Sequence, residues 1–181
     1  EKKSSKVSQN VTKVNGKQFT FATSNQGIIN YLTQQSNGNI ENEISVTSTS
    51  VNGDISYAKP INVVLGNDDS FKYFSSEDMQ NSSLTLNFKN YRIIPTGYTL
   101  NVQGIYQRRI PRSWVIEGST DYNNWEVIDS RNDFSNFDSL LTMNNDNSHQ
   151  FQFIRMRLTG PNWSGSNHFY LRSIEIYGTL I

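Results

Sequence analysis

The sequence contains no cysteine, so it can form neither a disulfide framework nor a thiolate metal site, and it offers no cysteine nucleophile. This absence favours a reducing compartment, although it is also compatible with a disulfide-free secreted protein. The sequence also lacks any run approaching the roughly 20 apolar residues that a membrane-spanning helix requires. No signal-peptide pattern opens the chain. We therefore expect no membrane span.

Net charge is absent as well. The 16 basic and 16 acidic side chains cancel, so no overall field attracts nucleic acid or an anionic membrane surface. Apolar residues make up only 35% of the 181 residues, but aromatic residues supply 12%, and large rings bury much apolar surface each. The composition predicts one domain with an aromatic β-rich core rather than a disordered chain.

The amino-terminal segment differs in composition from the rest. Residues 1–18 are mostly polar and basic and show no apolar period, which predicts a linker or tail, whereas residues 19–181 are expected to form a single domain. Within residues 27–32, apolar side chains recur at i, i+3 and i+4. This spacing predicts a short helix that ends in the turn-forming residues 36–39.

After the helix the apolar period changes to two, which predicts β-strands. The alternating segments are 44–47, 84–88, 98–102, 114–119, 125–129, 151–158 and 174–177. Segments 114–119 and 125–129 flank a polar connector, as the strands of a hairpin do. Because no helices alternate with these short strands, the sequence predicts an all-β antiparallel jelly-roll sandwich.

The three tryptophans have different settings. Trp114 and Trp125 begin the two strands of the hairpin, so we expect both rings to point inward and to form part of the core. Trp163 lies between Pro161 and Gly165, where a regular strand is excluded. It either closes the end of the barrel or stands in a ligand-binding loop, and we favour the first interpretation.

Several segments resemble the discoidin, or coagulation-factor C-type, family of galactose-binding-like domains. The matching segments are 62–70 (NVVLGNDDS), 111–119 (PRSWVIEGS), 124–129 (NWEVID), 153–157 (FIRMR), 159–165 (TGPNWSG) and 174–178 (IEIYG). The resemblance implies a jelly-roll sandwich that grips its ligand with loops at one end of the barrel.

In this sequence the corresponding loops are 52–57, 71–76, 106–109 and 162–168. The candidate ligand-binding residues that they carry are Tyr57, Tyr73, Tyr106, Arg108, Arg109, Trp163, Asn167 and His168. Such a mixture of flat rings and hydrogen-bond donors suits sugars, peptides and polar protein surfaces alike.

The same resemblance raises the expectation of a structural calcium ion in the early loop, where carboxylate and backbone oxygens suit a hard cation. The candidate ligands are Asn67, Asp68, Ser70 and Glu175. Leu65 stands where the family pattern has its first Asp, so one carboxylate ligand is missing.

Catalytic motifs are not found. Both histidines, His149 and His168, lie in polar segments without a second ligand at metal spacing. There is no Gly-Xaa-Ser-Xaa-Gly elbow and no glycine-rich phosphate loop. We therefore expect a binding module and not an enzyme.

Three ligand classes remain open. Because cysteine is absent and the segment TGPNWSGSN at 159–167 resembles family members found beside adaptor domains, our main hypothesis is a cytoplasmic module that binds another protein or the rest of its own chain. The first alternative is a carbohydrate-binding module of a secreted or surface protein, with Trp163 or Tyr73 stacked on a sugar. The second is phospholipid-surface binding, for which Phe71 and Phe74 would be the apolar spikes and Lys72 would add little attraction.

Overall fold

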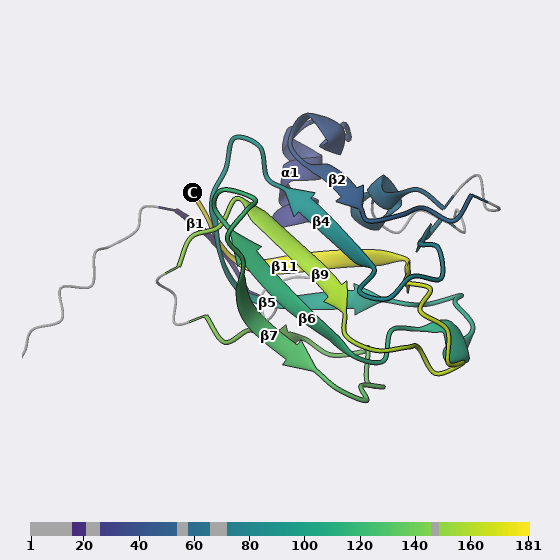
Figure 1. Ribbon diagram of the computed structural model, residues 1–181. Coiled ribbons are helices and arrows are strands. Elements are labelled where there is room, and N and C mark those ends of the chain that lie inside the picture. The colour runs from purple at the N-terminus through teal and green to yellow at the C-terminus, as the bar shows by residue number, and fades with distance from the viewer. Residues whose placement is uncertain (1–15, 21–25, 54–57, 66–71, 146–148) are drawn as a thin grey trace, which may run out of the picture.

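The computed structural model describes residues 16–20, 26–53, 58–65, 72–145 and 149–181. These residues form two antiparallel sheets that face each other, together with a small two-stranded ribbon (Figure 1). The four-stranded sheet has the order β1 (Lys17–Phe19), β11 (Ser173–Leu180), β5 (Ile93–Asn101) and β8 (Leu141–Thr142). The five-stranded sheet has the order β2 (Ser45–Ser48), β4 (Ser83–Asn87), β9 (Phe153–Leu158), β6 (Trp114–Ser119) and β7 (Glu126–Arg131). Strands β3 (Phe74–Ser75) and β10 (Tyr170–Leu171) pair in the ribbon. The predicted antiparallel sandwich is confirmed.

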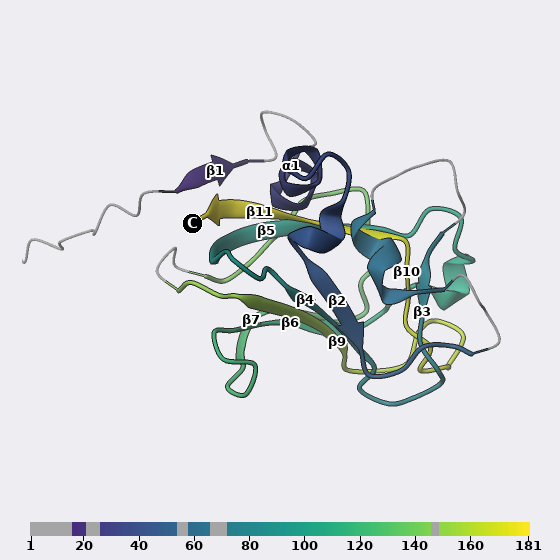
Figure 2. The ribbon, with the colours of Figure 1, turned by 90° about the horizontal axis from the view of Figure 1, so that it is seen from above.

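The expected helix is also present. α1 (Ile28–Gln35) lies on the outer face of the four-stranded sheet, against β11 (Figure 2). It buries Ile28, Ile29 and Leu32, the apolar side chains whose spacing predicted it. Three short 3₁₀ helices accompany it: η1 (Ile40–Asn42), η2 (Pro60–Val64) and η3 (Gln107–Arg109).

The alternating residues of β9 separate core from surface as predicted. Ile154, Met156 and Leu158 are buried between the sheets, whereas Arg155 and Arg157 lie on the outer face of the five-stranded sheet. There Arg155 Nε donates to Glu117 Oε2 over 2.7 Å, and the terminal nitrogen of Arg157 donates to Glu117 Oε1 over 2.9 Å. Burial raises the pKa of Glu117, but hydrogen bonds from the two arginines outweigh burial and lower the pKa overall.

Trp114 is fully buried between the sheets, as expected. Its indole Nε1–H donates to the hydroxyl of Tyr98 over 2.9 Å, and that hydroxyl donates to Asp129 Oδ2 over 2.6 Å. Phe134 and Phe137 pack against the indole ring. Burial raises the pKa of Tyr98, so the phenol stays protonated. It can therefore donate to Asp129 while it accepts from Trp114, and each of these buried polar groups has a partner.

The prediction that Trp125 points into the core is wrong. Its ring is only partly buried and lies on the outer face of the five-stranded sheet, where the guanidinium carbon of Arg155 is 3.9 Å from the ring centroid. The ring of Tyr122 meets it edge to face.

The cause is a bulge in the β6–β7 pairing. Ile116 pairs with Asp129, but the next residue, Glu117, pairs with Val127, so Ile128 is an extra residue in β7. The side chains of Asp129 and Ile128 both point between the two sheets. Every β7 residue before Ile128 therefore lies on the face opposite to the one that regular alternation would give it. Val127 accordingly is 54% exposed, and the tryptophan two residues earlier turns outward with it.

Phe74, one of the two apolar spikes that the phospholipid alternative would need, is not exposed. The ring is fully buried in β3, where it meets the ring of Phe169 edge to face at a centroid distance of 5.5 Å. Phe71, the other proposed spike, lies outside the described residues. No described helix is long and apolar enough to cross a membrane.

The sandwich has two distinct ends, which the strand register defines. Trp114 pairs with Leu158 at one end, and Ser119 pairs with Phe153 at the other. Residues 102–113 and 159–170 connect strands at the first end, which we call the rim; it lies on the right in Figure 1. Residues 120–125 and 149–152 lie at the second, which we call the hairpin end.

Candidate functional site

At the rim, four of the residues proposed from the sequence gather around Tyr170 of β10. The rings of Tyr73 and His168 have centroids 6.1 and 5.7 Å from that of Tyr170. The guanidinium carbon of Arg109 is 5.7 Å from the Tyr170 ring and 5.6 Å from the Tyr106 ring. These five residues form a continuous surface of rings and cationic or polar groups, which we call the rim cluster.

Members of the rim cluster differ in exposure. Tyr170 is only 6% exposed and forms the buried base of the cluster, whereas Tyr106 is 78% exposed. Tyr106 immediately precedes η3, which carries Arg108 and Arg109. Neither arginine forms an ion pair with any residue of the described chain. The cluster therefore presents one aromatic face beside the positive charges of Arg109 and its neighbour Arg108, neither of which has an acidic partner within the described chain.

The loop that delivers His168 is held by a buried amide. Asn162, which is 1% exposed, accepts hydrogen bonds at Oδ1 from the backbone N–H groups of Ser164 and Ser166, over 3.0 and 3.2 Å. Its Nδ2 donates to the carbonyl of His168 over 3.3 Å. The imidazole Nδ1 of His168 is in turn 2.8 Å from the carbonyl of Ser76. The position of the imidazole is thus fixed by Asn162 within the loop and by the carbonyl of Ser76, which directly follows β3.

Asn167, a further predicted ligand residue, anchors the loop instead of lining the cluster. Its backbone N–H donates to Asp78 Oδ1 over 2.7 Å. This hydrogen bond is the main reason why the pKa of Asp78 is lowered.

Trp163 does not close the end of the barrel, so the favoured interpretation of this residue is wrong. The side chain is 41% exposed, and the guanidinium carbon of Arg112 lies 4.6 Å from the ring centroid. Arg112 Nε also contacts Asp133 Oδ1 over 2.5 Å. No ring contact within the described chain connects Trp163 to the rim cluster, so it forms a separate feature of the same end.

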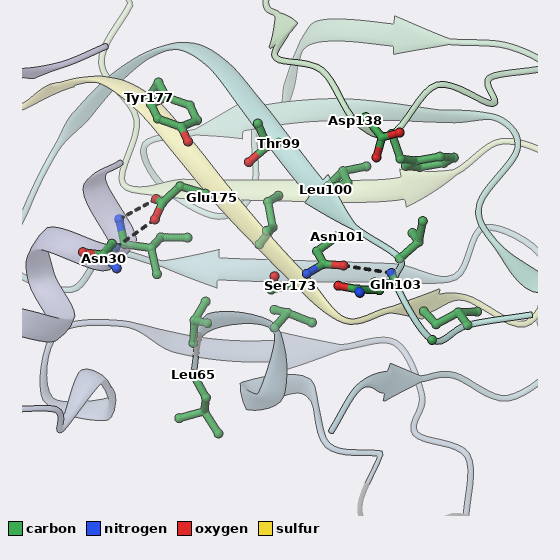
Figure 3. Close-up of a pocket in the computed structure, with 18 of the residues that line it drawn as sticks. Asn30, Leu65, Thr99, Leu100, Asn101, Gln103, Asp138, Ser173, Glu175 and Tyr177 are labelled. Carbon is green, nitrogen blue, oxygen red and sulfur yellow. Dashed lines mark hydrogen bonds between the residues drawn. The ribbon is translucent and has the colours of Figure 1, made fainter. Parts of the chain in front are cut away.

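A groove of about 920 Å³ lies on the outer face of the four-stranded sheet, between α1 and η2 on one side and residues 101–105 on the other (Figure 3). Glu175 projects into it from β11. Its Oε1 accepts from the Ile29 N–H over 2.8 Å and its Oε2 from the Asn30 N–H over 2.9 Å. The carboxylate therefore caps the first turn of α1 from a distant strand.

This arrangement depends on Gly27, because a Cβ there would lie 2.5 Å from the Glu175 side chain. Burial raises the pKa of Glu175 to about 7, although the backbone hydrogen bonds oppose the shift. The other proposed calcium ligands, Asn67, Asp68 and Ser70, lie outside the described residues, as does Tyr57. Within the described chain no three or more His, Asp and Glu side chains form a group that could hold a metal ion. The calcium site stays a prediction.

Sequence reasoning missed two residues on which the site depends. Tyr170 is the centre of the rim cluster, and Asn162 organises its loop. The apolar run 169–171 was the available signal for the short strand β10. No local pattern indicates that Asn162 is buried.

Comparisons with solved structures support the same architecture. A family 32 carbohydrate-binding module from a Clostridium perfringens glycoside hydrolase of family 31 superposes with a TM-score of 0.62 at 15% identity, covering 76% of this chain and 92% of that one. A second C. perfringens module of family 32, in complex with GalNAc-β-1,3-galactose, gives 0.59 at 17% identity, covering 75% and 95%. A fucose-binding module from Streptococcus pneumoniae gives 0.58 at 14% identity, covering 74% and 90%. The chain has a galactose-binding-like fold. Identities this low establish the fold alone.

Sequence comparisons give a different kind of relative. The chain is 31% identical over 97 residues to the E3 ubiquitin-protein ligase Ufd4 of Drosophila melanogaster, covering 49% of this chain and 4% of the ligase. It is 27% identical over 131 residues to the E3 ubiquitin-protein ligase hecd-1 of Caenorhabditis elegans, covering 69% and 5%. The chain thus corresponds to about a twentieth of these relatives' length. No protein-family model matches it.

Proposed function

We propose that this galactose-binding-like domain is a non-catalytic binding module that holds a glycan on the rim cluster. The observation that carries the proposal is the Tyr106 side chain, 78% exposed and held beside the Arg109 guanidinium. An aromatic ring presented next to fixed hydrogen-bond donors matches a sugar, which has an apolar C–H face and a hydroxyl edge. Two fold neighbours, a module in complex with GalNAc-β-1,3-galactose and a fucose-binding module, support the same ligand class.

In this proposal the sugar ring stacks on Tyr106, while Arg109 and the imidazole of His168 hydrogen-bond to its hydroxyls. Arg109 is held between the rings of Tyr106 and Tyr170. Little side-chain freedom is therefore lost when the sugar binds.

The test is a glycan array followed by calorimetric titration of the best ligand. Loss of one stacking ring costs about 1–1.5 kcal/mol, or roughly tenfold in affinity, so Tyr106→Ala and Arg109→Gln should each weaken binding about tenfold or more. Arg92→Gln is the matched control, because Arg92 lies at the hairpin end beside the carboxyl terminus. Unchanged affinity in both rim variants, or an array without signal, would contradict the proposal.

A second candidate is recognition of another protein or of the rest of the same chain, and it is favoured by the two ligase relatives. Arg108 and Arg109, which have no acidic partner among the described residues, would then bind an acidic segment. A glycan array without signal, combined with a partner that is recovered by the intact chain and lost on substitution of both arginines, would select this candidate. A glycan ligand would favour a secreted or surface protein, whereas a protein ligand, together with the absence of cysteine, would favour the cytoplasm.

A further inference from the structure

The hairpin end contains a pocket of about 540 Å³ that the rim proposal does not use. Trp125 forms part of its wall, together with Phe151, Glu126 and His149. Arg155 covers one face of the Trp125 ring, and the ring remains only partly buried. The bulge at Ile128 has thus moved a large aromatic side chain out of the core and into the wall of a pocket.

The polar groups around this ring have unused hydrogen-bonding capacity. His149 Nδ1 lies 2.9 and 2.8 Å from the two carboxylate oxygens of Glu126. The Nε2 atom of the same imidazole, the Thr120 hydroxyl and the Gln150 amide make no hydrogen bond to any described residue. The pocket therefore combines an aromatic wall with unpaired donors and acceptors.

The loop that forms one side of the pocket is already ordered. Asp121 Oδ1 accepts from the backbone N–H groups of Asn123 and Asn124 over 2.9 and 2.8 Å. The Trp125 Nε1–H donates to the carbonyl of Tyr122 over 3.0 Å. A loop fixed by its own hydrogen bonds loses little conformational freedom when a ligand binds, which favours binding of a small molecule.

We propose that this pocket is a second binding site, for a neutral pyranose sugar. The volume is within the range of small-molecule sites, roughly 300–1,000 Å³. Its single carboxylate, that of Glu126, is hydrogen-bonded to the His149 imidazole, and no Lys or Arg side chain of the described chain lines the pocket to attract an anionic ligand. A sugar would pack its C–H face against the part of Trp125 that Arg155 leaves open, and its hydroxyls would meet Glu126 and Gln150. The site stands at the opposite end of the sandwich from the rim and does not depend on the rim proposal.

Nuclear magnetic resonance of the ¹⁵N-labelled domain tests this directly, because Trp114, Trp125 and Trp163 give three separate indole signals. Trp125→Phe assigns the relevant signal. Methyl glycosides of galactose, glucose, mannose, N-acetylglucosamine and fucose are added to concentrations on the order of 10 mM, about ten times a dissociation constant of 1 mM.

We expect the Trp125 signal to shift saturably with at least one glycoside while the Trp114 signal stays in place. Glu126→Gln and Gln150→Ala should each raise the dissociation constant at least about tenfold, whereas the surface control Glu41→Gln should leave it unchanged. The shift should persist in Tyr106→Ala, because the rim is a different site.

Three results would overturn the proposal. They are a Trp125 signal that no glycoside moves, a dissociation constant that neither pocket variant changes, and a shift that disappears in Tyr106→Ala. Circular dichroism of each variant establishes that the fold is retained, and both pocket substitutions affect exposed side chains. A silent rim with a responsive Trp125 would contradict the rim proposal alone.

Discussion

Replacing Glu117 by Gln should destabilise the domain, because this carboxylate neutralises two arginines on the outer face of the five-stranded sheet. Its side chain is 6% exposed, while those of Arg155 and Arg157 are 24% and 29% exposed. Removing one partner of a fully buried ion pair costs about 3–5 kcal/mol. The arginines here can regain some water, so we expect a loss of about 2–3 kcal/mol. For a domain of this size that corresponds to a fall in Tm of about 4–12 °C.

The effect should also depend on pH. Since its hydrogen bonds with the arginines lower the pKa of Glu117 below the ordinary value of 4.5, the stability it contributes is present above pH 4.5. That contribution is lost as pH falls through the lower pKa of the folded state. The difference in unfolding free energy between the intact chain and Glu117→Gln should therefore be full at pH 7 and shrink in acid.

Urea unfolding followed by circular dichroism at several pH values measures both quantities, with Glu41→Gln as the control for loss of an exposed glutamate. A loss below about 0.5 kcal/mol at pH 7, the range of ordinary surface substitutions, would refute the reasoning. So would a difference that persists unchanged in acid.

Three further predictions concern other parts of the domain. Tyr98→Phe leaves the buried indole N–H of Trp114 without its acceptor and should lower the free energy of unfolding in urea by about 1–3 kcal/mol. An unchanged free energy of unfolding would contradict the stabilising role of the Trp114–Tyr98–Asp129 hydrogen bonds. Asn162→Ala should loosen the rim loop, seen as faster amide hydrogen exchange at Ser164 and Ser166, and should weaken rim ligands more than it lowers Tm. Because burial raises the pKa of Glu175 from 4.5 to about 7, its ionisation should make stability fall by up to about 3 kcal/mol as pH rises across that interval. With a chelator present, Glu175→Gln should flatten this slope, and an equal slope in both proteins would exclude the carboxyl as its source.

Local patterns were sufficient for the helix and the longer strands, but not for the short strands β1, β3, β8 and β10. Alternation of the side chains in β9 follows from the pleat itself, and the i, i+3, i+4 spacing of α1 follows from the helical turn. Both patterns reflect burial on one face, which each segment carries in its own sequence.

The rim cluster was only partly predictable. Tyr73, Tyr106, Arg109 and His168 were proposed as members of loops at one end, and the structure brings them together. Tyr170, at the centre, was not proposed, because its position depends on the pairing of β10 with β3, nearly a hundred residues earlier. Contacts of that separation leave no local signal.

A single inserted residue explains both the failed prediction for Trp125 and the pocket at the hairpin end. In a regular pairing, the inward position of Asp129, whose carboxylate accepts from the Tyr98 hydroxyl inside the sandwich, would place Val127 and Trp125 inward as well. The extra residue Ile128 reverses the inward–outward alternation of the residues that precede it, so the Trp125 side chain points out of the core. Periodicity alone cannot reveal one inserted residue. The bulge thus supplies the outward position of Trp125 on which the proposed second site depends.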